Sequence, residues 1–566
     1  MSLRPVRRPG LVSLLVLAGL PGPARAEPPA PEVQACLLSL RDGERARAEA
    51  ALGPLEALPF LQADLAVEPD AGNVRGRVTL LWTPRQPTGF VELRLTPNAF
   101  GRSLVRLSLP RINGEPGTLV TLSDDLLRVN FPRPVGAAEA VRLEVQLSAQ
   151  VPRAAAEDSA LSALQLSGRG ERTDHGAFSA RDDAVSLVGI VPRPPLTTGE
   201  GARGEGPTGI GDLALYDPAN VLVEVTVPAP WRAVAGGVAL GETPAPGGGT
   251  RYRFGIAAAR DVVLLVTRGY RRARREVAGV TLESSVPEPL GKAGERLLAQ
   301  AAELLGALER RLGPTPYRTL RVVAAPLTGG AGGMEFPGLL TVSTPLLRLA
   351  EDPGKALGLP GLELLPGSGE ALGSLVEFAL AHELAHQWFP ALVGSDPIAA
   401  PVVDEALAQA VALLAVEWTA GAAAAQAVDA VQVSGAYRMW RALGGRDAAA
   451  DRPTSAFTDE LTYAALVYGK APGLHARQRA LLGDAAFLAD LRAYVETHRW
   501  GWADSGSLTS LLARRHPERA RELRELQRRW WSEAHGDEDL GGAGASLVPA
   551  LPSEEELDRL LRQLER

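Results

Sequence analysis

Hydrophobic and polar residues alternate in short runs along the first half of the chain. These runs are rich in valine and leucine and are bounded by glycine, proline or asparagine, a pattern typical of strands with one buried face. The clearest are VRGRVTLLWT (74–83), VELRLTP (91–97), AVRLEVQLSA (140–149), ANVLVEVTVPA (219–229) and DVVLLVTRGY (261–270). PAPGGG at 244–249 is typical of a hairpin tip. The pattern predicts a large antiparallel β domain over 27–272 that forms one wall of a cleft.

The period of the pattern changes after Pro287. The segment 292–313, KAGERLLAQAAELLGALERRLG, has apolar residues at helical spacing, whereas TLRVVAAPL (319–327) has the character of a strand. GGMEFPGLLTVS (332–343) predicts another strand after a glycine-rich turn. The segment 351–373, rich in glycine, proline and leucine, is interpreted as an inserted loop that could gate the cleft.

Helices dominate the rest of the pattern. We expect one helix that contains HELAHQWF and ends at Pro390, because proline cannot continue a helix, and a second that starts near Val403. The segment 457–535 is mainly helical, and EEELDRLLRQLER (554–566) predicts a final charged helix. The fold class is therefore multidomain α+β, with a mixed α/β domain over 273–510 and a short helical segment over 511–566.

The N-terminal residues have the pattern of a secretory signal peptide. Arginines at positions 4, 7 and 8 precede an apolar run over 11–20, and Ala24-Arg25-Ala26 follows as a small-residue cleavage site. We therefore expect residues 1–26 to be removed and the mature protein to be periplasmic or secreted, with a buried N-terminal helix as the alternative. Since no later run reaches eighteen apolar residues, no integral membrane segment is expected after signal removal.

Composition narrows the classes of function. The 566 residues suggest several domains, and the net charge of −7, with acids and bases interspersed, argues against a nucleic-acid partner. Cys36 is the only cysteine, so the chain has no internal disulfide. It is interpreted as a buried or surface thiol, with lipid attachment as the alternative. The sequence leaves the oligomeric state undetermined.

The motif HELAH places His382, Glu383 and His386 together in a chain with only seven histidines. Residues four apart share a helix face, so both imidazoles can bind one ion. Glu405, nineteen residues further on, can supply a third ligand and leave the fourth tetrahedral position to water, the arrangement of a catalytic zinc. Glu383 is placed to accept a proton from that water. The alternatives are a solvated helix face or two histidines of the core.

Two further segments supply candidate residues for a cleft around this zinc. In GGAGGMEFPGL, Glu335 follows Gly332, Gly333 and Met334 beside a predicted strand. The glycines permit close approach of an extended peptide, and the carboxylate could hold the free ammonium group of that peptide. A solvent-facing turn glutamate is the alternative. In LTYAALVYGK, Tyr463 is either a hydrogen-bond donor near the metal or a packing residue.

These motifs together resemble the aminopeptidase N-like (gluzincin) zinc metallopeptidases, a family that also includes the leukotriene epoxide hydrolase. The resemblance covers about residues 60–500 and rests on HELAHQWF, Glu405, GGMEF and the two tyrosines before Lys470. It implies a saddle-like β domain followed by a thermolysin-like catalytic domain with one Zn²⁺.

The same resemblance implies a role for each matching residue. His382, His386 and Glu405 are expected to be the zinc ligands, Glu383 the general base and Glu335 the amine-binding glutamate. Tyr468 matches the tyrosine that stabilises the transition state. This chain has Asp404-Glu405-Ala406 where the family usually has Asn-Glu-Gly, and Pro337 follows Phe336 where many members have Asn-Trp. These departures put substrate preference in doubt.

We therefore expect an exported zinc aminopeptidase whose partner is a peptide with a free N-terminus. The alternatives are an endopeptidase of the thermolysin type, an epoxide hydrolase with the same zinc site, or an inactive exported binding protein.

Overall fold

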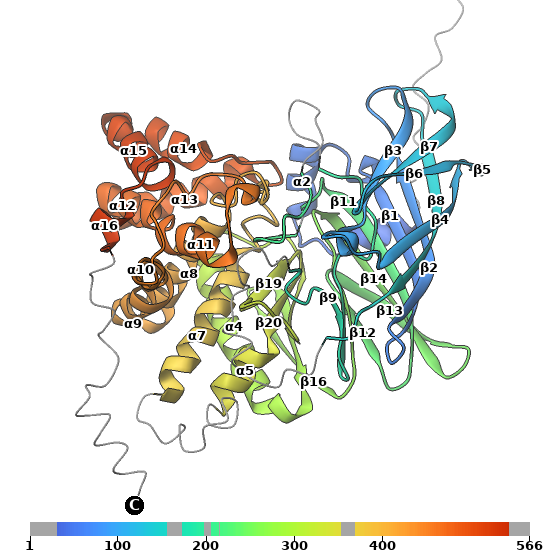
Figure 1. Cartoon of the computed structure of the whole chain (residues 1–566), viewed down its shortest axis with the longest axis horizontal. Coiled ribbons are helices and arrows are strands. Elements are labelled where there is room, and N and C mark those ends of the chain that lie inside the picture. The colour runs from blue at the N-terminus through green and yellow to red at the C-terminus, as the bar shows by residue number, and fades with distance from the viewer. Residues whose placement is uncertain (1–30, 155–172, 197–204, 214, 353–367, 543–566) are drawn as a thin grey trace, which may run out of the picture.

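The computed structural model describes residues 31–154, 173–196, 205–213, 215–352 and 368–542. Strands of the first half of the chain form one lobe, and helices of the second half form the other (Figure 1). A smaller sheet lies between them. The predicted signal peptide, most of the 351–373 segment and the final helix lie outside the described residues. Within them, no helix is long and apolar enough to cross a membrane.

The first lobe is built on an eight-stranded sheet in which every pair is antiparallel except the parallel pair β1–β11. In β8 buried positions alternate with more exposed ones, which explains why the period of two was visible in the sequence. The strands, in sheet order, are β13 (Val238–Ala245), β14 (Gly249–Ala259), β11 (Ala219–Pro228), β1 (Phe60–Glu68), β2 (Asn73–Trp82), β8 (Val141–Gln150), β4 (Val105–Ile112) and β5 (Glu115–Pro116).

Two smaller sheets and two short helices complete this lobe. The predicted hairpin tip at 244–249 joins β13 to β14, and the predicted strand 261–270 is shortened to β15. The three-stranded sheet contains β3 (Thr88–Arg94), β7 (Leu126–Val135) and β6 (Thr118–Ser123). The four-stranded sheet contains β12 (Arg232–Ala235), β15 (Leu264–Thr267), β10 (Ala184–Leu187) and β9 (Phe178–Ala180), and the helices are α1 (Pro31–Leu37) and α2 (Glu44–Leu52).

A five-stranded sheet begins the second lobe. Its order is β16 (Tyr270–Val277), β17 (Val280–Pro287), β18 (Thr319–Ala325), β20 (Leu339–Ser343) and β19 (Gly333–Phe336). The amphipathic helix α4 (Gly291–Leu312) makes the crossover that the parallel pair β17–β18 requires. The predicted domain limit at residue 272 falls inside β16; the limits otherwise stay predictions.

The segment 332–343 forms two strands and not the single strand that the sequence predicted. Pro337 and Gly338 separate β19 from β20, and Gly338 has a positive φ of 71°, which suits glycine in a tight turn. Since β19 is the last strand of the sheet, this turn places Glu335 at the sheet edge.

Two helices carry the HELAH motif and Glu405. Helix α7 (Ser368–Ala385) ends earlier than Pro390, because a residue that precedes proline disfavours helical geometry and the chain turns before it. Helix α8 (Glu405–Ala420) begins two residues after the predicted start. The remaining α-helices are α5 (Thr344–Glu351), α9 (Ala422–Val428), α10 (Ser434–Ala442), α11 (Glu460–Tyr463), α12 (Gly473–Leu482), α13 (Asp484–His498), α14 (Ser507–Arg515), α15 (Ala520–Gln527) and α16 (Gly536–Leu540).

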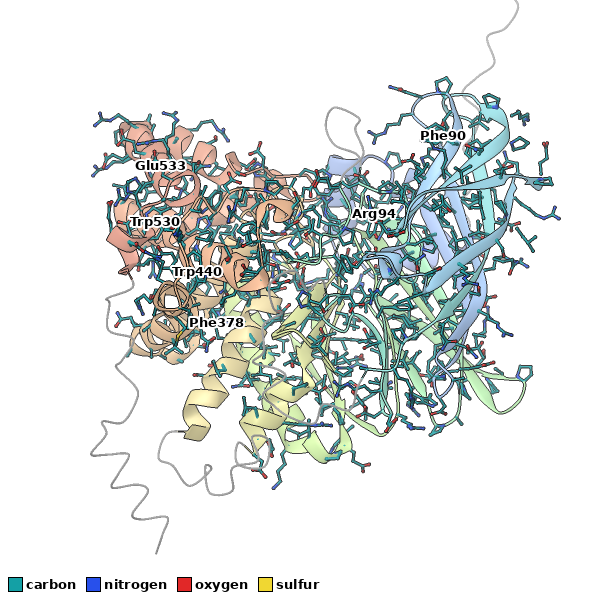
Figure 2. The ribbon with its side chains drawn as sticks, viewed as in Figure 1. Phe90, Arg94, Phe378, Trp440, Trp530 and Glu533 are labelled. Atoms are coloured by element: carbon teal, nitrogen blue, oxygen red, sulfur yellow. The ribbon has the colours of Figure 1, made fainter. Side chains whose placement is uncertain are left out.

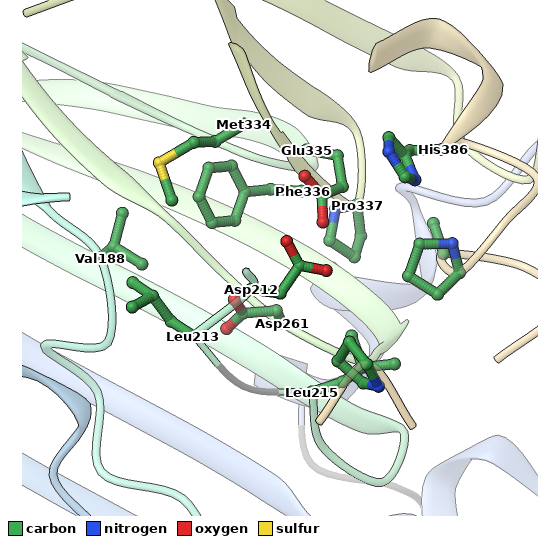
Figure 3. A pocket seen from close by; sticks show the side chains of 13 residues that line it. Val188, Asp212, Leu213, Leu215, Asp261, Met334, Glu335, Phe336, Pro337 and His386 are labelled. Atoms are coloured by element: carbon green, nitrogen blue, oxygen red, sulfur yellow. The ribbon is translucent and has the colours of Figure 1, made fainter. Parts of the chain in front are cut away.

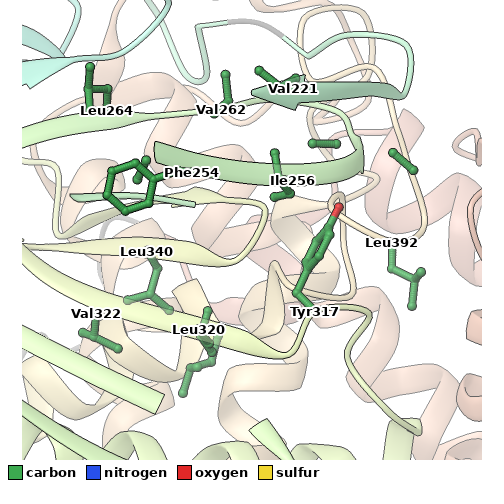
Figure 4. Close-up of a cluster of buried hydrophobic side chains, with 14 of the residues drawn as sticks. Val221, Phe254, Ile256, Val262, Leu264, Tyr317, Leu320, Val322, Leu340 and Leu392 are labelled. Carbon is green, nitrogen blue, oxygen red and sulfur yellow. The ribbon is translucent and has the colours of Figure 1, made fainter. Parts of the chain in front are cut away.

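One hydrophobic core extends through both lobes. Val221 and Ile256 of the first lobe lie in the same cluster as Tyr317, Leu320 and Leu340 of the second (Figure 4). Side chains fill the interior throughout, and a second cluster around Trp440 and Trp530 lies among the C-terminal helices (Figure 2). The lobes are therefore joined by buried apolar surface.

Polar contacts also join the lobes. The fully buried Arg260 of the β lobe donates hydrogen bonds to the carbonyl oxygens of Trp500 (2.9 Å) and Gly501 (2.7 Å). The Tyr317 hydroxyl donates to the Ala257 carbonyl at 3.2 Å.

Cys36 is a buried thiol within the β lobe. It donates a hydrogen bond to the Val221 carbonyl, and burial raises the pKa of the thiol to about 12.

We expect Trp500→Ala to lower stability strongly. The indole is fully buried at this junction, and truncating a buried tryptophan usually costs about 3–5 kcal/mol of unfolding free energy. Trp502→Ala is the matched control, because that ring is 38% exposed. Thermal unfolding of the two variants measures the difference, and equal midpoints would contradict a shared core at this position.

Candidate metal centre

The three predicted metal ligands converge at the junction of α7 and α8. His382 lies in the last turn of α7, His386 directly after it, and Glu405 in the first turn of α8. Nε2 of His386 lies 2.9 Å from Nε2 of His382. Oε2 of Glu405 lies 3.2 Å from Nε2 of His382 and 3.5 Å from Nε2 of His386. All three side chains are buried.

These residues fit a zinc ion. Three ligands of one tetrahedral zinc lie about 3.4 Å from each other when each is about 2.1 Å from the ion, close to the separations of the ligand atoms here. Oε2 of Glu405 is buried and faces the Nε2 atoms of both imidazoles. Nδ1 of His386 lies 2.5 Å from the Phe389 carbonyl, so donation there leaves the Nε2 lone pair for a metal.

The charges of the three groups favour a cation between them. Burial alone would disfavour the charged form of Glu405, but hydrogen bonds from His382 and His386 outweigh burial and lower the pKa of this carboxyl. Burial likewise disfavours the charged imidazole of His386, yet the charges of Glu335 and Glu405 raise its pKa well above the ordinary value. The site thus attracts positive charge to the point where the ligand atoms meet.

Asp404 positions Glu405 at the start of α8. Its carboxylate accepts the Glu405 backbone N–H at 3.0 Å and so caps the helix. Burial, and then the charge of Glu405, raise the pKa of Asp404 to about 7. An aspartate can cap this helix as an asparagine would, but it adds an acidic group beside the metal ligands.

Glu383 and Glu335 lie on the side of the centre that faces β19. Their carboxylates and the His386 imidazole bring three possible ligand atoms within 4.8 Å of one another. Burial, followed by the charge of Glu335, raises the pKa of Glu383 well above its ordinary value. Glu383 is therefore close to Glu335 and suited to accept a proton.

Gly333 allows this close approach of β19 to α7. A Cβ atom at Gly333 would lie 2.5 Å from the Glu383 carboxyl group, closer than real contacts allow. At Gly332 the nearest atom would be Cβ of Ala379 at 3.4 Å, an ordinary contact. Gly333 therefore permits the close approach of Glu383, whereas the predicted close approach of a peptide to Gly332 and Gly333 stays a prediction.

Tyr463 is the last residue of α11, and Tyr468 lies on the π-helical turn η7 (Ala464–Lys470) that follows it. The ring of Tyr468 lies 5.7 Å from that of His382, and burial, then the charge of Glu405, raise the pKa of its phenol, so it stays protonated. Tyr463 is 1% exposed and packs edge-on against Phe457 and Tyr468. This position matches the packing alternative; contact between Tyr463 and a substrate stays a prediction.

Lys470 fixes the turn that carries Tyr468. Its buried ammonium group donates to the Asp447 carboxylate at 2.9 Å and to the carbonyl oxygens of Ala448 and Glu533. In the sequence Lys470 served only to locate the tyrosine motif, and in the structure it holds the turn that carries Tyr468 in place.

Asp212 is the acidic residue of the site that the sequence did not predict. It comes from the connection between β10 and β11 and lines one pocket together with Glu335, Met334 and His386 (Figure 3). No local motif marks it, because only the folded chain brings the β lobe against the metal centre.

Comparison with known proteins agrees with this geometry. Residues 364–530 match the model of the peptidase family M1 domain. The chain carries a peptidase family M1 domain. This domain covers α7, α8 and the tyrosine turn, and it confirms the resemblance to aminopeptidase N-like metallopeptidases. The protein is a zinc metallopeptidase.

Solved structures extend the likeness to most of the chain. An M1 zinc metallopeptidase from Deinococcus radiodurans is 22% identical with a TM-score of 0.58, covering 88% of this chain and 95% of that one. A variant of that enzyme bound to a Tyr-Ser-Ala substrate is 21% identical with a TM-score of 0.56, covering 88% and 96%. These likenesses establish the fold of the M1 domain together with its β lobe. No curated protein matches this chain.

We expect Glu405→Ala to abolish stable zinc binding, since it removes one of three protein ligands and leaves two imidazoles. Elemental analysis after dialysis against a weak chelator measures the bound zinc. Glu417→Ala, further along α8 and paired with Arg479, is the control and should retain it. Full zinc content in the Glu405 variant would show that this carboxylate is not a ligand.

Gly333→Ala should impair hydrolysis much more than Gly332→Ala, because only the first methyl group meets Glu383. Displacing a general base is expected to cost about a hundredfold or more in kcat. Peptide hydrolysis by the two variants, each loaded with equal zinc, provides the comparison. Equal rates would mean that Glu383 is not held against β19 during catalysis.

Proposed function

We propose that the protein is an exported zinc aminopeptidase that removes the N-terminal residue of peptides. The observation that carries this proposal is the position of Glu335, whose carboxylate lies at the sheet edge beside Glu383 and His386. An ammonium group bound there would leave room for about one residue before the metal centre. Export is proposed from the signal-peptide pattern of residues 1–26.

The edge strand β19 supports the binding of an extended peptide. Because β19 is the last strand of its sheet and pairs only with β20 among the described strands, its outer edge can add the backbone of a substrate as a further strand. The similar D. radiodurans variant is bound to a Tyr-Ser-Ala substrate. The two facts favour a short peptide aligned along β19.

Residues of this chain would then share the steps of hydrolysis. His382, His386 and Glu405 would hold a zinc ion, which would supply Lewis acidity to a water molecule and to the scissile carbonyl. Glu383, whose raised pKa suits proton exchange, accepts the proton of the attacking water and delivers it to the leaving amine. The Tyr468 phenol donates a hydrogen bond to the developing oxyanion, an interaction typically worth about 3 kcal/mol of barrier.

The test compares a free-amine peptide with its N-acetylated form. We expect only the free-amine peptide to be cut, residue by residue from its N-terminus, because the acetylated one cannot offer an ammonium group to Glu335. Glu335→Gln should lower kcat/KM by about tenfold to a hundredfold, the loss of one charge-assisted hydrogen bond. Mass spectrometry of the products identifies the cleaved bond.

Zinc chelation is the control, since both the wild type and the variant should then lose activity. Cleavage of the acetylated peptide at an internal bond would replace the proposal with an endopeptidase of the thermolysin type.

A further inference from the structure

The pocket beside the metal centre has an unusual lining. Nine of its thirteen lining residues are apolar, one is His386, and the other three are acidic. These acids are Asp212, Asp261 and Glu335, and Figure 3 shows the carboxylates of Asp212 and Glu335 directed toward one another. No lysine or arginine is among the described residues that line this pocket. A cation is the kind of ligand that such a lining favours.

Asp261 has polar partners within the protein. It accepts a hydrogen bond from the Val262 N–H at 2.7 Å, and although burial raises its pKa to about 7, the charge of the fully buried Arg193 opposes that rise. The guanidinium of Arg193 is itself held by the carbonyl oxygens of Asp217 and Ala259. Asp261 therefore has a structural partner already.

Asp212 has no such partner. In the described part of the chain, its carboxylate makes no hydrogen bond or ion pair, and the charged groups around it are mainly the carboxylates of Glu335, Glu405 and Asp404. Burial, then the charge of Glu335, raise the pKa of Asp212 well above its ordinary value. A cation between Asp212 and Glu335 would remove this repulsion.

The position of Asp212 is fixed by contacts on both sides of it. Gly211 has a φ of 69°, and a Cβ there would lie 2.6 Å from the Tyr463 hydroxyl, so only glycine fits. The Thr208 hydroxyl donates to the Thr454 hydroxyl at 2.9 Å, and Leu213 belongs to a buried cluster with Phe336. The connection is thus held against the second lobe rather than free to withdraw the carboxylate.

The Tyr463 hydroxyl is a second polar group without a partner at this place. It is buried at 1% exposure, has no hydrogen-bond partner, and lies against Gly211 next to Asp212. A buried hydroxyl without a partner is costly unless a ligand completes it. A guanidinium or ammonium group offers several N–H donors, enough for both Asp212 and this oxygen.

The charge balance of the cleft leads to the same ligand. Five carboxyl groups lie together there, those of Asp212, Glu335, Glu383, Asp404 and Glu405. A divalent ion and the ammonium group of a peptide would supply three positive charges. A further cationic group on the substrate would meet the same acidic surroundings at Asp212.

We propose that Asp212 binds the positively charged side chain of the residue that is removed, so that the enzyme favours peptides beginning with arginine or lysine. This inference rests on the proposed aminopeptidase function and names its substrate class. Glu335 holds the α-ammonium group, and Asp212, from the β lobe, selects the side chain.

The test uses arginyl and citrullyl reporters, which share an α-ammonium group and side-chain length but differ in side-chain charge. We expect the wild type to favour the arginyl reporter in kcat/KM by about tenfold or more, as expected for one charge-assisted contact. Asp212→Asn should bring the ratio close to one. Asp182→Asn, an exposed aspartate of the same lobe, should keep the wild-type ratio.

Two outcomes of this assay would overturn the inference. They are a wild-type ratio near one, or an equal loss on both reporters in the Asp212 variant, which would make Asp212 a second anchor for the α-ammonium group. If neither reporter is cut while an acetylated peptide is, the aminopeptidase proposal itself fails. Slow cleavage of both reporters at equal rates leaves that proposal standing and removes only the charge preference.

Binding measured without turnover gives an independent readout. Zinc-loaded Glu383→Gln should bind arginine amide about tenfold or more tightly than citrulline amide by calorimetry. Adding Asp212→Asn should remove the difference, and its thermal midpoint checks that the variant is folded. Equal affinities for the two amides in Glu383→Gln would overturn the inference even if turnover rates differ.

Discussion

Repulsion among carboxyl groups in one buried cleft is the constraint on which the rest of this structure depends. Burial and the neighbouring charges raise the pKa values of Glu383, Glu335 and Asp212, whereas contacts with two imidazoles lower that of Glu405. Like charges at such separations are stable only when cations compensate them or when some of the groups hold protons. The cleft is therefore built to receive positive charge, from a metal at one end and from a substrate at the other.

The fold has to hold these groups together against their repulsion. The predicted ligands come from α7, the residue after it and α8, the predicted amine-binding glutamate from a sheet edge, and Asp212 from the other lobe. A hydrophobic core that runs through both lobes fixes their relative position, and the buried ion pair between Glu44 and Arg499, at 2.7 Å, adds a polar tie. Gly333 then removes the one steric obstacle between β19 and Glu383. Rigidity across the lobe junction is thus a condition for the chemistry.

The elements with a clear period could be predicted from the sequence. Burial alternates along strands of the β lobe such as β8, and α4 has one apolar face. Both elements could therefore be recognised from the order of apolar and polar residues in the sequence. The HELAH histidines and Glu405 could be predicted as a metal site for a different reason. Helical spacing and the number of ligands that a metal needs restrict the sequence positions that its ligands can occupy. The structure brings all three together, as the spacing required.

The features that the sequence did not predict have two causes, local limits on the backbone and contacts between distant segments. Pro337 and Gly338 turn the predicted strand 332–343 into a hairpin, and the turn before Pro390 shortens α7, because local backbone limits prevail over an apolar pattern. Asp212 lies in a connection rich in glycine and proline, where no period exists. Sequence spacing alone does not distinguish Tyr463 from Tyr468. Their packing does, because the Tyr463 ring is buried whereas the Tyr468 ring lies beside His382.

The division of labour between the lobes has a chemical consequence. The predicted metal ligands and general base lie on α7, directly after it, and at the start of α8, where their surroundings are buried, whereas Asp212 lies on a connection of the β lobe. That connection is tied to the catalytic lobe by Thr208 and Thr454 and by the contact between Gly211 and Tyr463. A substitution at residue 212 would alter the charge presented to a substrate side chain without moving a metal ligand. With Asp212 in the proposed role, substrate choice would vary independently of the proposed hydrolytic centre.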